Sequence, residues 1–255
     1  MNIILSGYGK MGRLIEQRAA EKGHKIAAVI DPAAGSGLGT VVFKNIESLE
    51  KIPSGSIAID FTHPDAAVRN IESFAERRIP LVIGTTGWYD KLDEVTALIK
   101  RTESSLLWAS NFSIGVNIFY RIAALCAAFI EPYAEYDASG FEVHHNQKAD
   151  SPSGTAKMIA EQVLKNMKRK TTVVWDKLDR PPTPEEIHFA SLRSGATPGV
   201  HALIFDSAAD SIEIKHTARN REGLVSGAIH AAEWLYKNTE AGKRGVFTME
   251  DILAQ

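Results

Sequence analysis

Two histidines, a lysine and a helix start lie close together in one short stretch of the chain. His144 and His145 precede Lys148, and the turn Ser153-Gly154-Thr155 opens a predicted helix over 155–167. A histidine can gain or lose a proton near neutral pH, and a lysine carries a fixed positive charge. Free N–H groups at a helix start can bind a carboxylate. This composition is typical of an active site that protonates an acidic substrate.

Each of these features also has a purely structural explanation. His144 could be a buried histidine bonded to the backbone, and the Ser-Gly-Thr turn could be an ordinary capped helix start. The lysine and the second histidine beside His144 favour chemistry. On a strand, Glu142 and His144 share one face while His145 points to the other, which disfavours a metal site made of the adjacent histidines. We therefore predict no metal site.

A glycine-rich turn directly follows the first predicted strand. Gly7, Gly9 and Gly12 form the pattern G-x-G-x-x-G and lead into a predicted helix. The first glycine permits the tight turn, the second a close approach to a pyrophosphate, and the third close packing of helix on strand. Asp31 ends the next apolar strand, near the spacing of roughly 20 residues expected for a carboxylate on the adenosine ribose. This order predicts dinucleotide binding rather than a chance glycine turn with a capping aspartate.

Length, charge and hydropathy limit the possible functions. With 255 residues the chain can form one large or two medium domains. A net charge of -2 offers no basic footprint for nucleic acid or an anionic membrane, and no segment is long and apolar enough to cross a bilayer. The first strand begins at the N-terminus without a signal-peptide pattern. We expect a cytoplasmic protein that binds neither nucleic acid nor membrane.

Strands and helices alternate in the first part of the chain. The predicted strands cover 2–6, 25–30, 56–62, 80–86 and 106–112, with helices over 13–22, 64–78 and 89–101. Such alternation predicts a doubly wound parallel sheet, in which ligands lie beyond the carboxyl ends of the strands. Gly84-Thr85-Thr86 and Ala109-Ser110-Asn111-Phe112 lie at two of these ends. We predict that both contact a cofactor, although each could be an ordinary turn.

The pattern changes after Phe112. The predicted elements are a helix over 116–130, a strand over 140–145, a helix over 155–167, strands over 188–193, 201–206 and 211–217, and a last helix over 224–237. Successive strands without intervening helices are typical of an antiparallel or mixed sheet. We therefore predict a second domain of the α+β class.

Together these motifs resemble the 4-hydroxy-tetrahydrodipicolinate reductase family, also called dihydrodipicolinate reductase. The string His-His-x-x-Lys-x-Asp-x-Pro-Ser-Gly-Thr, from His144 to Thr155, is specific, whereas many dehydrogenases share the glycine motif. The segments 84–86, 109–113 and 245–253 extend the resemblance over nearly the whole chain. The resemblance implies reduction of the dehydrated 4-hydroxy-tetrahydrodipicolinate ring by hydride from NAD(P)H, in the diaminopimelate route to lysine.

The resemblance also implies a role for each matching residue. His144 is the expected proton donor and acceptor, and Lys148 its catalytic partner. The small dicarboxylate substrate is expected to contact His145, Gly154 and Thr155, and the argument from free N–H groups at the helix start adds Ser153. With Asp31 from the ribose argument, the expected cofactor contacts are Gly7, Tyr8, Gly9, Lys10, Met11, Gly12, Asp31, Gly84, Thr85, Thr86, Ala109, Ser110, Asn111 and Phe112.

A domain division and an assembly follow from the same resemblance. Residues 1–114 and 223–255 would form a Rossmann-like dinucleotide-binding domain. Residues 115–222 would bind the substrate and assemble a homotetramer. The strands between 188 and 217, whose edges must be paired or covered, would form much of the interface.

Some residues depart from the family pattern at positions that bear on cofactor preference and on substrate contacts. Pro32 follows Asp31 where members that use NADPH well often carry arginine, so we expect NADH to be preferred over NADPH. Lys10 or Arg13 could counter this bias by approaching a 2′-phosphate. The departures near the expected substrate contacts are Asn146, Gln147 and Ser151.

Two other classes of function stay open at this point. Another two-domain NAD(P)-dependent oxidoreductase would fit the architecture, but the aspartate-semialdehyde type needs a nucleophilic cysteine, and Cys126 lies in an apolar helical run. A sugar oxidoreductase would not need the carboxylate-binding turn. A non-catalytic dinucleotide sensor would keep the fold without needing His144 or Lys148.

Overall fold

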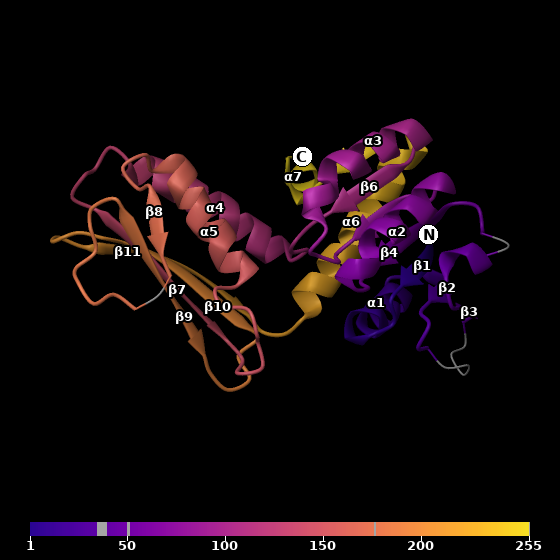
Figure 1. The fold of residues 1–255 in the computed structure, drawn as a ribbon, viewed down its shortest axis with the longest axis horizontal. Coiled ribbons are helices and arrows are strands. Elements are labelled where there is room, and N and C mark those ends of the chain that lie inside the picture. The colour runs from indigo at the N-terminus through magenta and orange to yellow at the C-terminus, as the bar shows by residue number, and fades with distance from the viewer. Residues whose placement is uncertain (35–39, 50–51, 176, 255) are drawn as a thin grey trace. The chain divides into compact units, whose positions relative to one another are not determined.

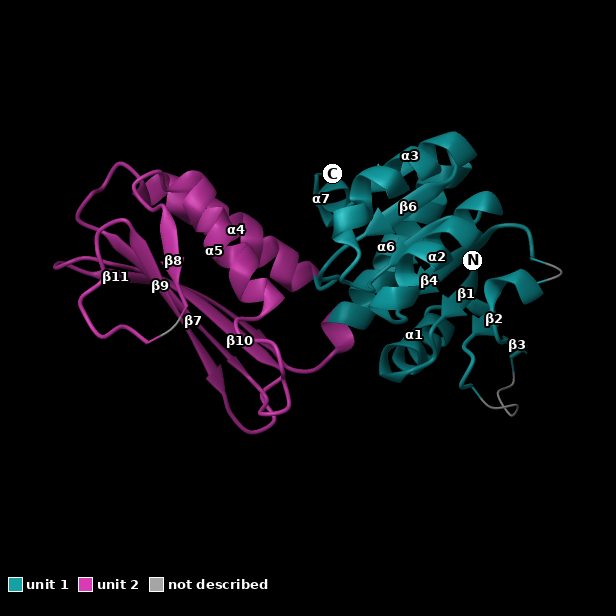
Figure 2. Ribbon diagram, viewed as in Figure 1, with its two compact units in different colours: residues 1–113, 224–255 teal, residues 114–223 magenta. Residues whose placement is uncertain are grey.

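The chain forms two compact units (Figures 1 and 2). The computed structural model describes residues 1–34, 40–49, 52–175 and 177–254. The first unit comprises Met1–Ser113 and Leu224–Gln255, and the second comprises Ile114–Gly223. The predicted division has its boundaries one residue away, at 114 and 223. The roles that we expect of the two parts stay predictions.

The first unit contains a parallel sheet, seven-stranded over the described residues, with strand order β12-β6-β5-β4-β1-β2-β3. Its strands are β1 (Asn2–Ser6), β2 (Lys25–Ile30), β3 (Val42–Phe43), β4 (Ser56–Asp60), β5 (Leu81–Ile83), β6 (Ser105–Trp108) and β12 (Gly245–Phe247). Reversal of the order at β1 and β4 is the topology of dinucleotide-binding sheets. The doubly wound parallel sheet is thereby confirmed.

Helices flank this sheet and bury its apolar side chains. They are α1 (Lys10–Glu21), α2 (Pro64–Glu76), α3 (Leu92–Thr102), α6 (Glu222–Glu240) and α7 (Met249–Leu253), with short 3-10 helices η1 (Ile46–Ser48) and η2 (Tyr89–Lys91). Ile4, Ala58, Phe74 and Ile83 are among the fully buried core residues. Gly227 lets α6 approach the loop after β6, because a Cβ at this glycine would lie 1.8 Å from the Phe112 carbonyl oxygen.

Three strands of this sheet end earlier than predicted. β4, β5 and β6 end at Asp60, Ile83 and Trp108, rather than at 62, 86 and 112. After β4 the chain leaves the sheet because the Thr62 N–H donates to side chains, at 3.1 Å to Asp60 Oδ1 and 2.8 Å to Thr85 Oγ1. The residues that follow the strands are therefore loops at the carboxyl edge of the sheet.

The second unit is a mixed sheet with two helices on one face (Figure 1). Its elements are α4 (Ile114–Ile130), β7 (Asp137–His144), α5 (Gly154–Asn166), β8 (Thr172–Val174), β9 (Glu186–Arg193), β10 (Gly199–Asp206) and β11 (Ser211–Ala218). The strand order is β11-β10-β7-β9-β8, with β7 parallel to β9 and antiparallel to β10. Phe189, Leu203 and Ile159 are fully buried between sheet and helices. The predicted α+β unit is confirmed.

Across the described ranges of both units, no helix combines the length and the apolar character needed to cross a membrane.

Candidate functional site

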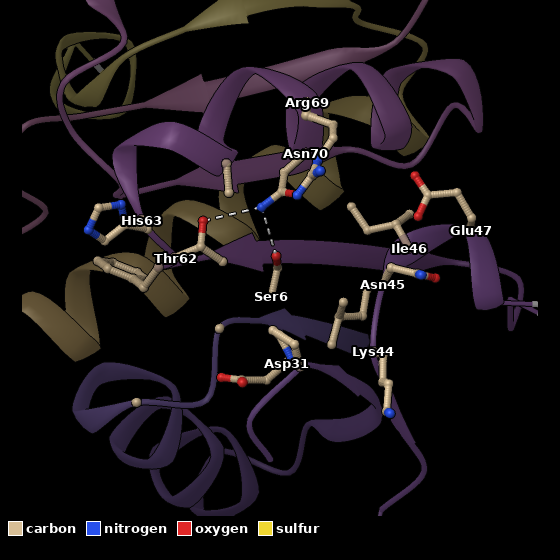
Figure 3. A pocket seen from close by; sticks show the side chains of 16 residues that line it. Ser6, Asp31, Lys44, Asn45, Ile46, Glu47, Thr62, His63, Arg69 and Asn70 are labelled. Atoms are coloured by element: carbon tan, nitrogen blue, oxygen red, sulfur yellow. Dashed lines mark hydrogen bonds between the residues drawn. The ribbon is translucent and has the colours of Figure 1, made fainter.

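A pocket of about 730 Å³ opens in the first unit at the carboxyl ends of β1, β2 and β4 (Figure 3). Gly7, Gly9 and Asp31 line it from one side, and Thr62 and Asn70 from the other. Parallel sheets of this strand order bind dinucleotides at this edge. The pocket therefore lies where the sequence predicts the cofactor.

The glycine turn has the backbone that the motif requires. Gly7 has a φ of +89°, and a Cβ there would lie 2.4 Å from the Phe61 carbonyl oxygen. A Cβ at Gly12 would lie 2.2 Å from the carbonyl oxygen of Gly7, whereas Gly9 faces open space. Because Gly9 carries no side chain to cap α1, a phosphate can approach the N–H groups at the helix start. The turn fits a pyrophosphate.

Asp31 is fixed at the rim of this pocket by backbone donors. Its Oδ2 accepts the Tyr8 N–H at 2.7 Å, and its Oδ1 accepts the Ala33 N–H at 2.7 Å. Lys44 and Arg69 bring positive charge to the same pocket and are not among the residues predicted from the sequence. Arg13 instead lies over the Tyr8 ring, with its guanidinium carbon 5.6 Å from the ring centre.

A fully buried carboxylate, Asp60, organises the floor beneath the pocket. Oδ1 accepts from the Thr85 and Thr62 hydroxyls at 2.7 and 2.8 Å. Oδ2 accepts from the Ser6 hydroxyl at 2.6 Å and the Asn70 amide at 2.9 Å. In Figure 3 the Asn70 amide points between Thr62 and Ser6. The hydroxyl of Thr85, an expected cofactor contact, is therefore used to hold the loop after β5.

The other two expected cofactor segments lie further along the same edge and do not line this pocket. Gly84 follows β5, where a Cβ would lie 2.2 Å from the Phe61 ring. Phe112 is buried and packs edge to face on Phe61, with ring centres 6.0 Å apart. The Asn111 side chain accepts the Ser113 N–H at 2.8 Å, which shapes the loop after β6. Ser110 is exposed in that loop.

In the second unit, strand register gathers polar side chains on the helix-covered face of the sheet. Glu142 on β7 lies between His201 on β10 and Ser191 on β9. His144, two residues after Glu142 on β7, lies beside Arg193 of β9. Glu142 and His144 share one buried face, as strand alternation predicts. His201, Ser191 and Arg193 are not among the residues predicted from the sequence.

Glu142 is the centre of this group and has no exposed surface. Its Oε1 accepts the Ser153 N–H at 2.9 Å and the Ser191 hydroxyl at 2.8 Å, and the Arg193 guanidinium lies 3.3 Å away. Burial opposes the charged form, but the nearby His201 ring and the donors from Ser153 and Ser191 outweigh it. They hold the pKa of Glu142 far below its ordinary value. The carboxylate is therefore ionised.

His144 lies against this carboxylate. Its Nδ1 is 3.1 Å from Glu142 Oε2, but the ring N–H is not aligned with the oxygen, so the contact is electrostatic rather than a well-formed hydrogen bond. The His201 ring packs edge to face at 5.0 Å. Burial lowers the pKa of His144 to about 4, helped by the nearby His201, Lys148 and Arg193 and opposed by Glu142. The free protein thus holds a neutral imidazole at neutral pH.

Lys148 and His145 lie in the turn that follows β7. The Lys148 ammonium is 2.7 Å from the Asp150 carboxylate. Burial opposes ionisation of Asp150, yet the bond from Lys148 lowers its pKa. His145 is half-buried, and its carbonyl accepts the Lys148 N–H at 3.1 Å. Because Asp150 is exposed, the Lys148 ammonium is not locked into this pair and can also reach another carboxylate.

The helix start after this turn differs from the prediction in one respect. Ser153 is the N-cap of α5, and its hydroxyl accepts the Ala156 N–H at 3.1 Å. Its own N–H donates to Glu142, so Ser153 does not supply the free backbone donor that we expect from the sequence. The first helical residue is Gly154, beside which a Cβ would meet nothing within 4 Å. The space for a ligand at this helix start is therefore beside Gly154.

Glu142, His144 and His201 each place one potential ligand atom within 4.8 Å of the others. These donor types could hold a divalent metal. Arg193, however, already supplies positive charge to the carboxylate. We interpret the group as an ionic network, and the absence of a metal site stays a prediction.

Comparison with known proteins covers the whole chain. Residues 1–112 match the family model for the N-terminus of dihydrodipicolinate reductase, and residues 115–253 match the model for its C-terminus. A 4-hydroxy-tetrahydrodipicolinate reductase of Christiangramia forsetii is 37% identical over 100% of this chain and 98% of its own length. One of Archaeoglobus fulgidus is 34% identical over 99% of this chain and 100% of its length.

Solved structures share the fold. A dipicolinate-bound dihydrodipicolinate reductase from Paenisporosarcina sp. superposes with a TM-score of 0.78 at 23% identity, over 97% of both chains. An amine dehydrogenase from Mycobacterium smegmatis gives a TM-score of 0.64 at 13% identity, over 96% of this chain and 94% of its own.

Proposed function

Since this chain belongs to the dihydrodipicolinate reductase family, it is an NAD(P)H-dependent oxidoreductase of the diaminopimelate route to lysine, and we propose which residues carry its reaction. The reaction reduces dehydrated 4-hydroxy-tetrahydrodipicolinate to tetrahydrodipicolinate. The observation that carries the proposal is the buried His144 beside an ionised carboxylate, next to a lysine and an open helix start. The group supplies both a proton and charges that suit a dicarboxylate.

We assign the cofactor to the first unit. The turn from Gly7 to Gly12 would hold the pyrophosphate, and the pocket beside Asp31 the adenosine ribose. The segments 84–86 and 109–112 would border the nicotinamide, because they follow the next strands of the same edge. When bound, NAD(P)H supplies the hydride.

Asp31 favours NADH within this assignment. Its carboxylate can accept hydrogen bonds from ribose hydroxyls but repels a 2′-phosphate. Lys44 and Arg69 line the same pocket and would reduce this repulsion, so NADPH should also serve. Replacement of Lys44 by Ala should then weaken NADPH binding about two- to fivefold, the size of an exposed charge pair, and leave NADH binding unchanged.

The second unit would bind the substrate and deliver the proton. Lys148 and the N–H groups at Gly154 and Thr155 would hold the two carboxylates, with His145 as a further polar contact. His144 would protonate the carbon next to the one that receives the hydride. The dianionic substrate would raise the pKa of His144 from its low value, because a nearby negative charge favours the imidazolium ion. Substrate binding would thereby load the proton.

We also propose a homotetramer assembled through the second unit. On the sheet face opposite α4 and α5, apolar side chains alternate with the buried ones, as at Phe141, Val143 and Ile204. Leu192 on this face is 55% exposed. A contiguous apolar face of this kind is typical of an interface between copies of a chain. We place the enzyme in the cytoplasm, where NAD(P)H and amino-acid precursors are found.

The test is an absorbance assay of nicotinamide oxidation with freshly generated substrate, run with NADH and NADPH in parallel. Turnover with both cofactors, and a higher kcat/KM with NADH, would support the proposal. Cofactor binding without turnover would instead indicate a dinucleotide sensor. A higher kcat/KM with NADPH would show that Lys44 and Arg69 outweigh Asp31.

A further inference from the structure

We propose that Glu142 is a positioning residue that sets both the orientation of His144 and the place of the helix start at Ser153, with His201 and Arg193 holding its carboxylate. The inference rests on the proposed role of His144 as proton carrier. It explains why a charged side chain without exposed surface lies in the middle of the sheet. Neither the glycine motif nor the cofactor pocket involves this residue.

The strand register builds this arrangement as two adjacent rows. The first row places His201, Glu142 and Ser191 side by side on β10, β7 and β9. In the next row, His144 lies beside Arg193. The backbone ladder fixes these positions, so the contacts do not depend on flexible loops. Such support is what a proton carrier needs to keep its ring in one orientation.

The carboxylate uses its two oxygens for different tasks. Oε1 accepts from Ser153 and Ser191 and faces Arg193, which anchors the helix start to the sheet. Oε2 is left for the two imidazoles, 3.1 Å from His144 Nδ1 and 3.6 Å from His201 Nε2. One carboxylate therefore links the proton carrier to the turn that would bind a substrate carboxylate.

The contact at Nδ1 selects the other nitrogen of His144 for proton transfer. A carboxylate beside Nδ1 favours a proton on that atom, so Nε2 is free to carry the proton that is delivered. Gly199 lies next to Nε2, and a Cβ at this glycine would be 3.1 Å from it. The absence of a side chain at Gly199 leaves Nε2 uncrowded on this side.

Glu142 also favours protonation of His144. Burial, His201, Lys148 and Arg193 all lower the pKa of His144, and Glu142 is the group that opposes them. Removal of its charge would therefore lower the pKa of His144 further. The proton carrier would then be harder to load at any given pH.

The first experiment replaces Glu142 by Gln, which keeps the size of the side chain and an oxygen for the Ser153 N–H. We expect kcat to fall about 10²-fold or more, as when an orienting carboxylate is neutralised beside a catalytic histidine, with a much smaller change in KM. Because the pKa of His144 should fall in this variant, the part of the kcat profile that depends on protonated His144 should shift to lower pH. Glu142→Asp, which keeps the charge, should restore part of the turnover. Glu161→Gln on the exposed face of α5 is the matched control and should leave kcat unchanged.

The second experiment reads the imidazole directly, without turnover. In isotope-labelled protein, NMR reports the tautomer and the pKa of His144, with the signal assigned by its loss in His144→Gln. We expect a proton on Nδ1 in the unchanged protein, and a lower pKa with a mixed tautomer in Glu142→Gln. Gly199→Ala is a further variant that crowds Nε2 without touching Glu142, and its kcat should fall several-fold.

The outcomes separate this inference from the proposed function. If His144→Gln keeps near-normal turnover, the proposed role of His144 fails. If His144→Gln loses turnover while Glu142→Gln keeps kcat, tautomer and pKa, the role of His144 stands and the positioning role of Glu142 is overturned. If Glu142→Gln does not fold, a proton on Nε2 rather than Nδ1 of His144 in the unchanged protein would overturn the positioning role, and an unchanged kcat in Gly199→Ala would overturn the assignment of Nε2.

Discussion

Each unit of the molecule has a fully buried carboxylate in its sheet, and the two have different surroundings. Asp60 in the first unit accepts from three hydroxyls, the Asn70 amide and the Thr62 backbone N–H, none of which titrates near neutral pH. Glu142 in the second unit faces two imidazoles and a guanidinium. Asp60 therefore stabilises loops at the cofactor edge, whereas Glu142 acts on groups that can move protons. Both carboxylates are buried, so burial does not distinguish them. The groups that donate to each carboxylate decide whether it holds loops in place or influences groups that carry protons.

The largest effect that the comparison predicts is on folding. Asp60→Ala leaves the Ser6, Thr62, Thr85 and Asn70 donors without their acceptor, so the free energy of unfolding should fall by about 3 kcal/mol. Denaturant unfolding measures this loss. The shape of the kcat profile with pH should not change, because the groups that donate to Asp60 are hydroxyls and amides. A shifted pH profile would break the distinction between the two carboxylates.

The next effect concerns Lys148, the cation near the Glu142 network, which is the group formed by Glu142, His144, His201 and Arg193. Lys148→Ala removes a charge that we assign to the substrate, so KM should rise and kcat should fall, each about tenfold. Steady-state kinetics at varied substrate give both numbers. The matched control is Lys165→Ala on the exposed surface of α5, where the lysine pairs with Glu161 four residues earlier. An equal loss in both variants would mean that the net charge of the protein, rather than the position of Lys148, determines the kinetics.

A smaller effect is expected in the pH dependence of stability. His144 has a folded pKa of about 4, below its ordinary value of 6.5, so the unfolded chain binds more protons between these values. The free energy of unfolding should therefore decrease as pH falls from about 6.5 toward 4. His144→Gln should show a weaker decrease, while the part due to His216, whose pKa is also lowered by burial, stays in both proteins. Equal slopes would show that His144 is not desolvated.

Local sequence patterns predicted most of the fold and the cofactor edge. The alternation of apolar strands and helices gave the parallel sheet, and Gly7, Gly9 and Gly12 located the pocket. Short strands were missed because two or three residues, as in Val42–Phe43, carry no measurable periodicity. Strand ends were placed too late, because Thr62 and Thr85 read as β-formers although their hydrogen bonds go to side chains.

The Glu142 network could be predicted only in part. His144, Lys148 and Ser153 are close in sequence, so their proximity was visible, but the partners on β9 and β10 depend on strand register. One signal was available. In β10, His201 occupies a position in step with the buried Leu203 and Phe205, where an apolar residue is expected. A polar residue at a core position marks a partner across the sheet. The use of the Ser153 N–H by Glu142 follows from this contact and had no local signature.

The central claim is that His144 supplies the proton, and the most direct measurement is the turnover of His144→Gln at saturating substrate. Glutamine keeps a polar side chain of similar reach but cannot shuttle a proton. We predict that kcat falls about 10²- to 10⁴-fold, the usual contribution of a positioned acid, while NADH binding measured by fluorescence stays unchanged. Near-normal turnover would contradict the account, because the proton would then have to come from Lys148 or water, and the ionic network around Glu142 would be structural.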